Sequence, residues 1–106
     1  MWRAGVDLRL SQQVSALSMD RGRVCGVTLA DGRRLTARRG VVLACGGFGH
    51  DAARAAELLP RAAEHLSLSV PTAKGGGLRL AEAVGAALDH DLASAAALCP
   101  VSRVPW

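Results

Sequence analysis

Aromatic residues are scarce in this 106-residue chain: they make up 3% of it, and Tyr is absent. Trp2, Phe48 and Trp106 are the whole aromatic set. Half of the residues are hydrophobic, so Ala, Val and Leu have to form any core. Modules that bind nucleic acids usually combine stacking aromatic side chains with clustered positive charge. The scarcity of aromatic residues therefore argues against nucleic acid as a partner.

Lysine is represented by Lys74 alone, although Lys and Arg together number 13 and the formal net charge is +4. The arginines are spread along the chain, so the sequence predicts no basic stripe.

No apolar run approaches the ~18 residues that indicate a membrane-spanning helix. The N-terminus also lacks an apolar segment of signal-peptide length. We expect no membrane span and a cytoplasmic location.

Cysteines are few, and none is arranged for metal binding. Cys25, Cys45 and Cys99 are far apart and form no C-x-x-C motif. An odd number at such spacing predicts neither a disulfide framework nor a zinc site, and it fits a reducing compartment. The three histidines, at 50, 65 and 90, fit no common ligand spacing and are expected on loops or at the surface.

The first third of the chain alternates apolar and polar residues, which is typical of strands. Val6, Leu8 and Leu10 predict a first strand. Turn residues at 20–22 and 31–32, rich in Asp and Gly, separate three further strands over 14–19, 23–30 and 34–38. Because the connections are short, these three strands are expected to form an antiparallel meander.

A continuously apolar run over 40–44 predicts one strand that is buried on both faces. Glycine-rich residues 45–49 follow it, and then Asp51 is expected to cap a helix over 52–59 that Pro60 ends. Residues 61–72 are expected to be irregular or short-helical. A second glycine-rich stretch, 74–77, precedes a helix of about three turns that carries apolar residues from Leu78 to Leu88. The sequence therefore predicts an α/β fold with two helices.

Glycine alone does not decide what the two glycine-rich stretches do. Gly46 and Gly47 either let a ligand approach the backbone or make an ordinary strand-to-helix turn. Residues 75–77 either line a ligand or form a plain linker. The G-x-G-x-x-G, P-loop and G-x-S-x-G motifs are all absent. A weaker interpretation is that these loops bind phosphate or a nucleotide on their own.

Three segments resemble FAD-binding flavoproteins of the fumarate reductase, succinate dehydrogenase and 3-ketosteroid Δ1-dehydrogenase family. Residues 40–48, GVVLACGGF, are similar to the family's GVVLATGGF. Residues 5–27 resemble its GVDIRL…V…GRVVGV run, and residues 74–86 its TGDGLRLAEAAGA. The stretch EHLSL at 64–68 favours the ketosteroid dehydrogenase-like branch. The likeness covers nearly the whole chain, with the motifs in the same order.

The resemblance implies that residues 1–106 form one unit, an internal fragment of a Rossmann-like FAD-binding domain. Residues 1–49 would supply strands, the meander and the glycine turn, and residues 50–106 would be helical, towards the substrate-domain junction. The cofactor it implies is FAD. The positions that match the family's cofactor-binding residues are Val14, Ala44, Cys45, Gly46, Gly47, Gly75 and Gly77.

Three positions depart from the family pattern. Cys45 and Lys74 stand where the family usually has Thr, and Gly76 stands where it usually has Asp, close to the flavin. The resemblance implies hydride transfer to or from a carbon–carbon bond next to a carbonyl. It also implies catalytic Tyr residues, which this chain does not contain, so the fragment is expected to be inactive alone and to need the remainder of the flavoprotein.

The alternative is a structural or self-association module that has lost the cofactor. Under either interpretation an open sheet edge would promote a homo-oligomer.

Overall fold

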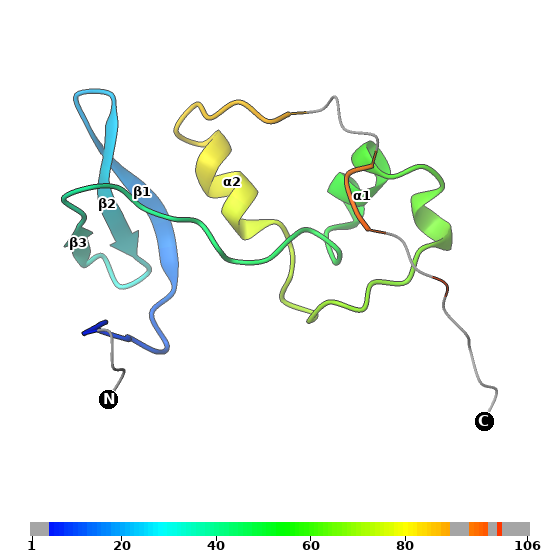
Figure 1. The fold of residues 1–106 in the computed structure, drawn as a ribbon, viewed down its shortest axis with the longest axis horizontal. Helices are drawn as coiled ribbons and strands as arrows, with labels where there is room; N and C mark the ends of the chain where they lie inside the picture. The colour runs from blue at the N-terminus through cyan, green and yellow to red at the C-terminus, as the bar shows by residue number, and fades with distance from the viewer. Residues whose placement is uncertain (1–4, 90–93, 98–99, 101–106) are drawn as a thin grey trace. The chain divides into compact units, whose positions relative to one another are not determined.

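The computed structural model describes residues 5–89, 94–97 and 100, and its chain divides into two compact units, Met1–Val42 and Leu43–Trp106. The first unit holds the strands β1 (Val14–Asp20), β2 (Arg23–Leu29) and β3 (Arg34–Thr36). The second holds the helix α1 (Ala52–Leu58), a 3₁₀ turn η1 (Ala62–Glu64) and the helix α2 (Gly76–Glu82). Figure 1 labels the strands and the two α-helices. Among the described residues, each α-helix has seven residues, far fewer than the ~20 that cross a bilayer.

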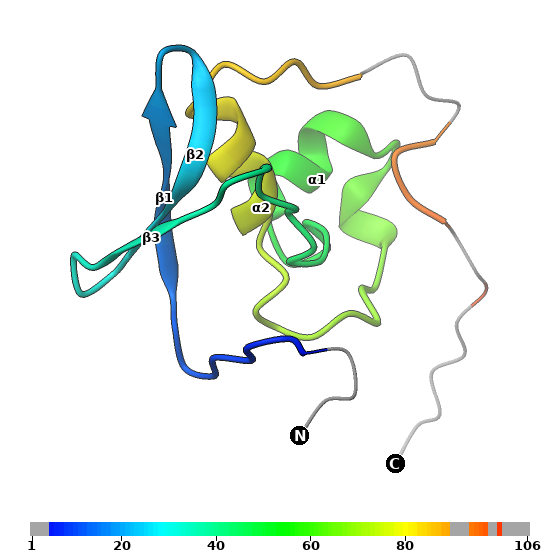
Figure 2. The ribbon, with the colours of Figure 1, turned by 60° about the vertical axis from the view of Figure 1, so that its left-hand side comes forward.

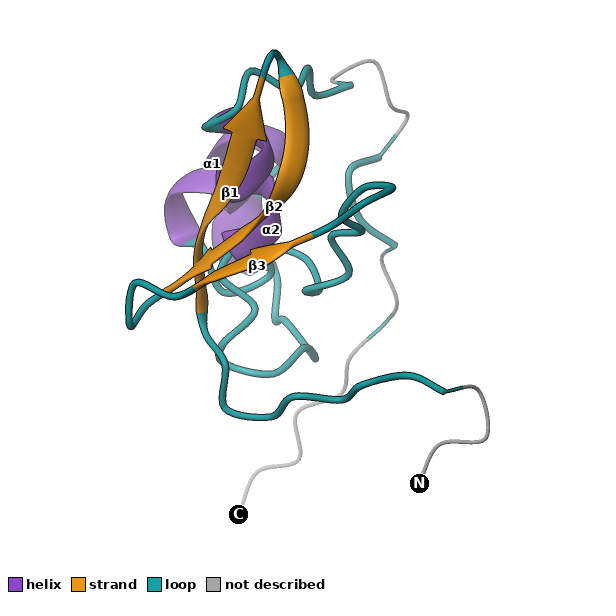
Figure 3. Cartoon of the chain, turned by 90° about the vertical axis from the view of Figure 1, so that its left-hand side faces the viewer, coloured by secondary structure: helices purple, strands orange, loops and turns teal. Residues whose placement is uncertain are grey.

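The three strands of the first unit form the predicted meander (Figure 3). β2 lies between β1 and β3 and pairs antiparallel with both. Arg21 and Gly22 both have positive φ, 46° and 76°, which suits the twist of a tight hairpin. At the second turn the Asp31 carboxylate accepts a hydrogen bond from the Arg33 N–H at 2.9 Å. The hydrogen bonds from Arg33 also hold the pKa of Asp31 below its ordinary value.

Gly26 lies where β2 and β3 leave no room for a side chain. It is buried in β2, opposite Ser18 of β1 and Thr36 of β3. A Cβ on Gly26 would collide with the backbone carbonyl of Leu35. The Ala37 N–H extends the pairing by donating to the Cys25 carbonyl at 2.7 Å. The sheet therefore requires glycine at this position.

Two apolar segments do not form the strands that their sequence predicts. Residues 6–10 have no strand structure, and Val6, Leu8 and Leu10 are exposed. Residues 40–44 also lack it, and Val42 is 89% exposed. The prediction of a buried strand is wrong for this structure because such a strand needs neighbours on both sides. No strand among the described residues pairs with either segment.

The helix α1 begins and ends as predicted, within one residue. Asp51 is its N-cap, and the carboxylate accepts a hydrogen bond from the Arg54 N–H at 3.2 Å. Leu59 is the C-cap, and Pro60 follows. The irregular stretch after it contains η1, in agreement with the expected short-helical segment.

The helix α2 is shorter than predicted because it ends at Glu82. Gly85 has φ +80°, and its N–H donates to the Glu82 carbonyl. The N–H of Ala86 donates to the Ala81 carbonyl at 3.1 Å. These two bonds make a Schellman motif, with Gly85 in the position that favours glycine. The apolar spacing up to Leu88 therefore continues beyond the helix.

We expect Gly26→Ala to destabilise the meander by about 1–3 kcal/mol, because the new methyl group forces β2 and β3 apart. Urea denaturation and the exchange rate of the Ala37 amide would measure this loss. Arg34→Ala is the control, since Arg34 is exposed in the same strand pair and its change should cost less than about 0.5 kcal/mol. Equal stability of the two variants would contradict the close approach at Gly26.

Candidate functional site

The two glycine-rich stretches come together in the second unit. We call residues 45–49 the first glycine loop and residues 74–77 the second. The N–H of Gly75 donates to the carbonyl of Gly47 at 3.0 Å. Just beyond the first loop, the N–H of His50 donates to the carbonyl of Ala73 at 2.9 Å. Because α1 follows the first loop and α2 starts within the second, these bonds also tie the two helix starts together.

Two glycines of the second loop, Gly75 and Gly77, pack closely against the first loop. Gly75 is buried with φ +69°, and a Cβ there would lie 3.3 Å from the Cβ of Phe48. Gly77 is also buried, and its Cβ would lie 3.3 Å from the sulfur of Cys45. A side chain at either position would crowd the first loop, so the close fit of the two loops favours glycine there.

Gly46 and Gly47 of the first loop have a different setting, because their backbone is open. Gly46 and Gly47 are exposed, and a Cβ at either position would meet nothing within 4 Å. Gly46 has φ +77°, which itself favours glycine. Gly47 has neither a positive φ nor a close neighbour, so nothing within the described chain requires glycine there. Bare backbone of this kind is what a ligand can approach closely.

Asp51 joins the two helices at the edge of the loops. In addition to capping α1, its carboxylate accepts a hydrogen bond from Arg79 Nη1 of α2 at 2.8 Å. The hydrogen bond from the Arg54 N–H and the positive charge of Arg79 hold the pKa of Asp51 below its ordinary value. The carboxylate therefore stays charged in the folded chain at neutral pH.

Arg54 and Glu82 form the second link between these helices. Nη1 and Nη2 of Arg54 donate to the two carboxylate oxygens of Glu82, at 2.9 and 2.7 Å. This fork geometry is the strongest arrangement for an arginine and a carboxylate. The hydrogen bond to Glu82 raises the pKa of Arg54 above its ordinary value. Figure 2 shows α1 and α2, which these pairs connect.

An open hollow of about 880 Å³ lies beside the first glycine loop. Phe48, Leu59, Leu66 and Leu68 supply much of its apolar lining, and Ser67 and Ser69 contribute hydroxyls. Gly49 faces these serines, since a Cβ there would lie 2.8 Å from the Ser69 hydroxyl oxygen. An apolar hollow with a few polar groups is the usual form of a small-molecule site.

The structure brings together five of the seven predicted cofactor positions. Cys45, Gly46, Gly47, Gly75 and Gly77 form the paired loops described above. Ala44 is exposed directly before them. Val14 belongs to the first unit, where it is half-buried at the start of β1.

The residues that sequence reasoning missed are Arg54, Arg79 and Glu82. Their signal was present, since positions 51 and 54 carry opposite charges one turn apart, and so do 79 and 82.

The two described histidines, His50 and His65, bond to the carbonyls of Ser69 and Pro60, at 2.9 and 2.8 Å. Among the described residues, no three metal-ligating side chains gather. His90 and Cys99 lie outside the described residues.

The family model of the FAD binding domain matches residues 1–106. The chain belongs to this family. FAD is the family's cofactor, and the described three-stranded antiparallel sheet and two helices are consistent with part of such a domain. The open backbone of Gly46 and Gly47 fits a cofactor that needs a close approach to the chain.

Two enzymes illustrate what this FAD binding domain is similar to. It is 33% identical over 114 residues, 98% of the chain, to a 3-oxosteroid 1-dehydrogenase of Mycobacterium tuberculosis. It is 45% identical over 67 residues, 63% of the chain, to a 4-oxocyclohexanecarboxylate 2-dehydrogenase of Sinomonas cyclohexanicum. The matched segments cover 20% and 12% of these two enzymes. No solved structure matches the chain.

We expect Gly75→Ala to destabilise the second unit by about 1–3 kcal/mol. The methyl group would have to fit a left-handed backbone conformation and a tight contact with Phe48. Thermal unfolding followed by circular dichroism would measure the loss. Gly76→Ala is the matched control, because its Cβ would enter open space and φ there is not positive. We expect Gly76→Ala to leave the stability unchanged or to raise it slightly. An equal loss of stability in both variants would refute the packing role of Gly75.

Proposed function

We propose that this chain is a part of an FAD-dependent dehydrogenase, in which the first glycine loop lets its backbone approach the flavin cofactor. The observation that carries the proposal is Gly47. Its glycine identity has no internal cause, since its φ is ordinary and a side chain would meet nothing within 4 Å. Contact with a bound molecule supplies the missing reason.

The second glycine loop serves a different purpose in this proposal. Gly75 and Gly77 support the first loop from behind, because their missing side chains let Phe48 and Cys45 pack against them. The departure at Gly76, where related flavoproteins usually have Asp, removes a polar contact to the flavin. Cofactor affinity therefore depends more heavily on the first loop.

The chemistry we propose is hydride transfer to or from a carbon–carbon bond beside a carbonyl. FAD supplies the hydride acceptor or donor when it is bound. The residues of this chain bind and orient it, and the apolar hollow beside Phe48 offers room for the ring of a cyclic ketone. The two similar enzymes are named for substrates of that kind, an oxosteroid and an oxocyclohexanecarboxylate. Proton-transfer groups would come from the rest of the flavoprotein, so we propose that this chain is not catalytic alone.

The second candidate is a self-association module that has lost the cofactor. The observation in its favour is the apolar run over 41–43, in which Val42 is 89% and Leu43 37% exposed. Unpaired apolar backbone of this kind can add a strand from a second copy.

We expect Gly47→Ala to leave the fold intact and to weaken FAD binding by at least about tenfold, equivalent to 1.4 kcal/mol. The methyl group has room within the chain but would occupy the space where the cofactor approaches. Flavin fluorescence titration would measure the affinity, and circular dichroism would check the fold. Arg34→Ala is the control, because Arg34 is exposed in the meander and lies outside both glycine loops.

Equal flavin affinity of the parent chain and Gly47→Ala would contradict the proposal. Absence of flavin binding, together with a dimer in size-exclusion chromatography, would favour the self-association module instead. Replacement of Val42 by Lys should then restore the monomer, because a charge on the exposed run opposes strand pairing.

A further inference from the structure

Two ion pairs join α1 to α2, one helical turn apart. Arg79 Nη1 lies 2.8 Å from Asp51 Oδ2, and Arg54 Nη2 lies 2.7 Å from Glu82 Oε2. Both partners in the second pair are three residues further along than those in the first, so the pairs stack on matching helix faces. We call this arrangement the ladder. The Arg79–Asp51 pair is its outer rung, and the Arg54–Glu82 pair is its inner rung.

Arg54 is the shielded partner of the inner rung, whereas the side chain of Glu82 is 37% exposed. The side chain of Arg54 is 14% exposed, and both of its terminal nitrogens bond to Glu82. The Nε of Arg54 lies 3.6 Å from the point that a Cβ on Gly75 would occupy. The guanidinium group therefore lies directly over Gly75, whose N–H holds the carbonyl of Gly47.

We propose that Arg54 and Glu82 are positioning residues for the flavin site. By bridging α1 and α2 across Gly75, they hold the hydrogen bond between Gly75 and Gly47 closed and so fix the open backbone of the first glycine loop. Neither residue is required to touch the cofactor. The part that concerns flavin rests on the function proposed above, whereas the part that concerns loop docking does not.

Reversal of the inner rung provides the test. Arg54→Glu alone opposes two carboxylates, and Glu82→Arg alone opposes two guanidinium groups. The double exchange R54E/E82R places both acids on α1 and both bases on α2, so each rung remains complementary. Arg54→Lys keeps the charge but loses the paired hydrogen bonds to Glu82. It replaces a reversed single variant in the test if that variant fails to fold.

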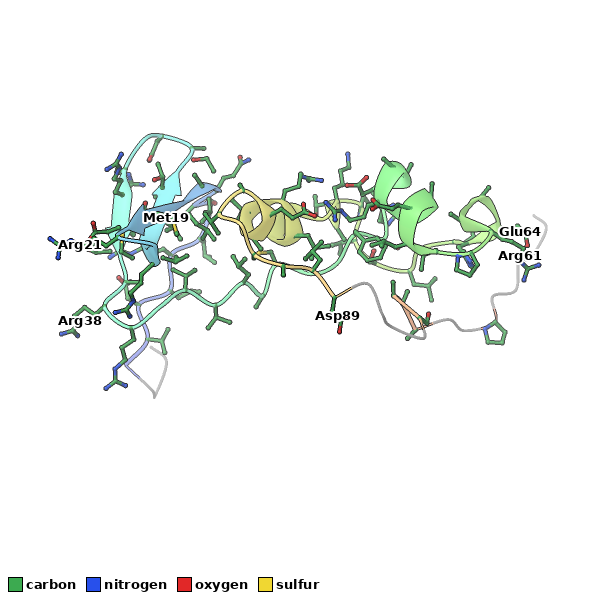
Figure 4. The ribbon with its side chains drawn as sticks, turned by 90° about the horizontal axis from the view of Figure 1, so that it is seen from above. Met19, Arg21, Arg38, Arg61, Glu64 and Asp89 are labelled. Atoms are coloured by element: carbon green, nitrogen blue, oxygen red, sulfur yellow. The ribbon has the colours of Figure 1, made fainter. Side chains whose placement is uncertain are left out.

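The first readout is hydrogen exchange of the Gly75 amide, followed by NMR on the 106-residue chain. We expect each single reversal to speed this exchange by about tenfold or more and the double exchange to return it to within about threefold. The exchange rate in Arg54→Lys should lie between those of the single reversals and the double exchange. The control is Glu64→Arg, which breaks an exposed pair with Arg61, labelled in Figure 4, and should leave Gly75 exchange unchanged.

The second readout is flavin affinity, which we expect to fall with the single reversals and return with the double exchange. Unchanged Gly75 exchange in both singles, or no recovery in the double exchange, would overturn the positioning role. Restored exchange without restored affinity would also overturn it for the flavin site. If the parent chain binds no FAD at all, the proposed function fails, but the Gly75 exchange rates still decide whether the inner rung holds the loops.

Discussion

The second unit is organised around the docking of its two glycine loops, in which the N–H of Gly75 donates to the carbonyl of Gly47. Gly75 suits this contact because it adopts φ +69° and has no side chain to crowd Phe48. The start of each helix is fixed by the loop that leads to it, so this contact also sets where α1 and α2 lie relative to one another. Two ion pairs then connect these helices, Arg79 with Asp51 and Arg54 with Glu82.

This arrangement gives the glycines of one unit two distinct purposes. At Gly75 and Gly77 the missing side chain admits a neighbour from the same chain. At Gly47 a side chain would meet no described residue within 4 Å, and we propose that a bound molecule uses this space. Gly75 and Gly77 thus have a packing reason within the second unit, whereas Gly47 has none among the described residues. Because the chain belongs to the FAD binding domain family, FAD is the ligand we propose for the open backbone at Gly47.

Local features were predictable from the sequence, and features that need distant partners were not. The turn residues at 20–22 and 31–32 and the cap at Asp51 are set by neighbours a few positions away, and all three are observed. The buried strand over 40–44 needed flanking strands that the described residues do not provide. For α2, apolar spacing predicted too long a helix because Gly85 stops it first. The glycine loops were recognised by resemblance, but their docking could be seen only in three dimensions.

The central claim is that the two docked loops present the backbone of Gly46 and Gly47 to FAD. Titration of the ¹⁵N-labelled chain with FAD, followed by amide NMR, tests it most directly. The account predicts saturable shifts at Gly46 and Gly47, with the amides of Gly22 and Gly32 in the meander turns unchanged. Saturable shifts confined to the meander, or no shifts at FAD concentrations that saturate related flavoproteins, would contradict it.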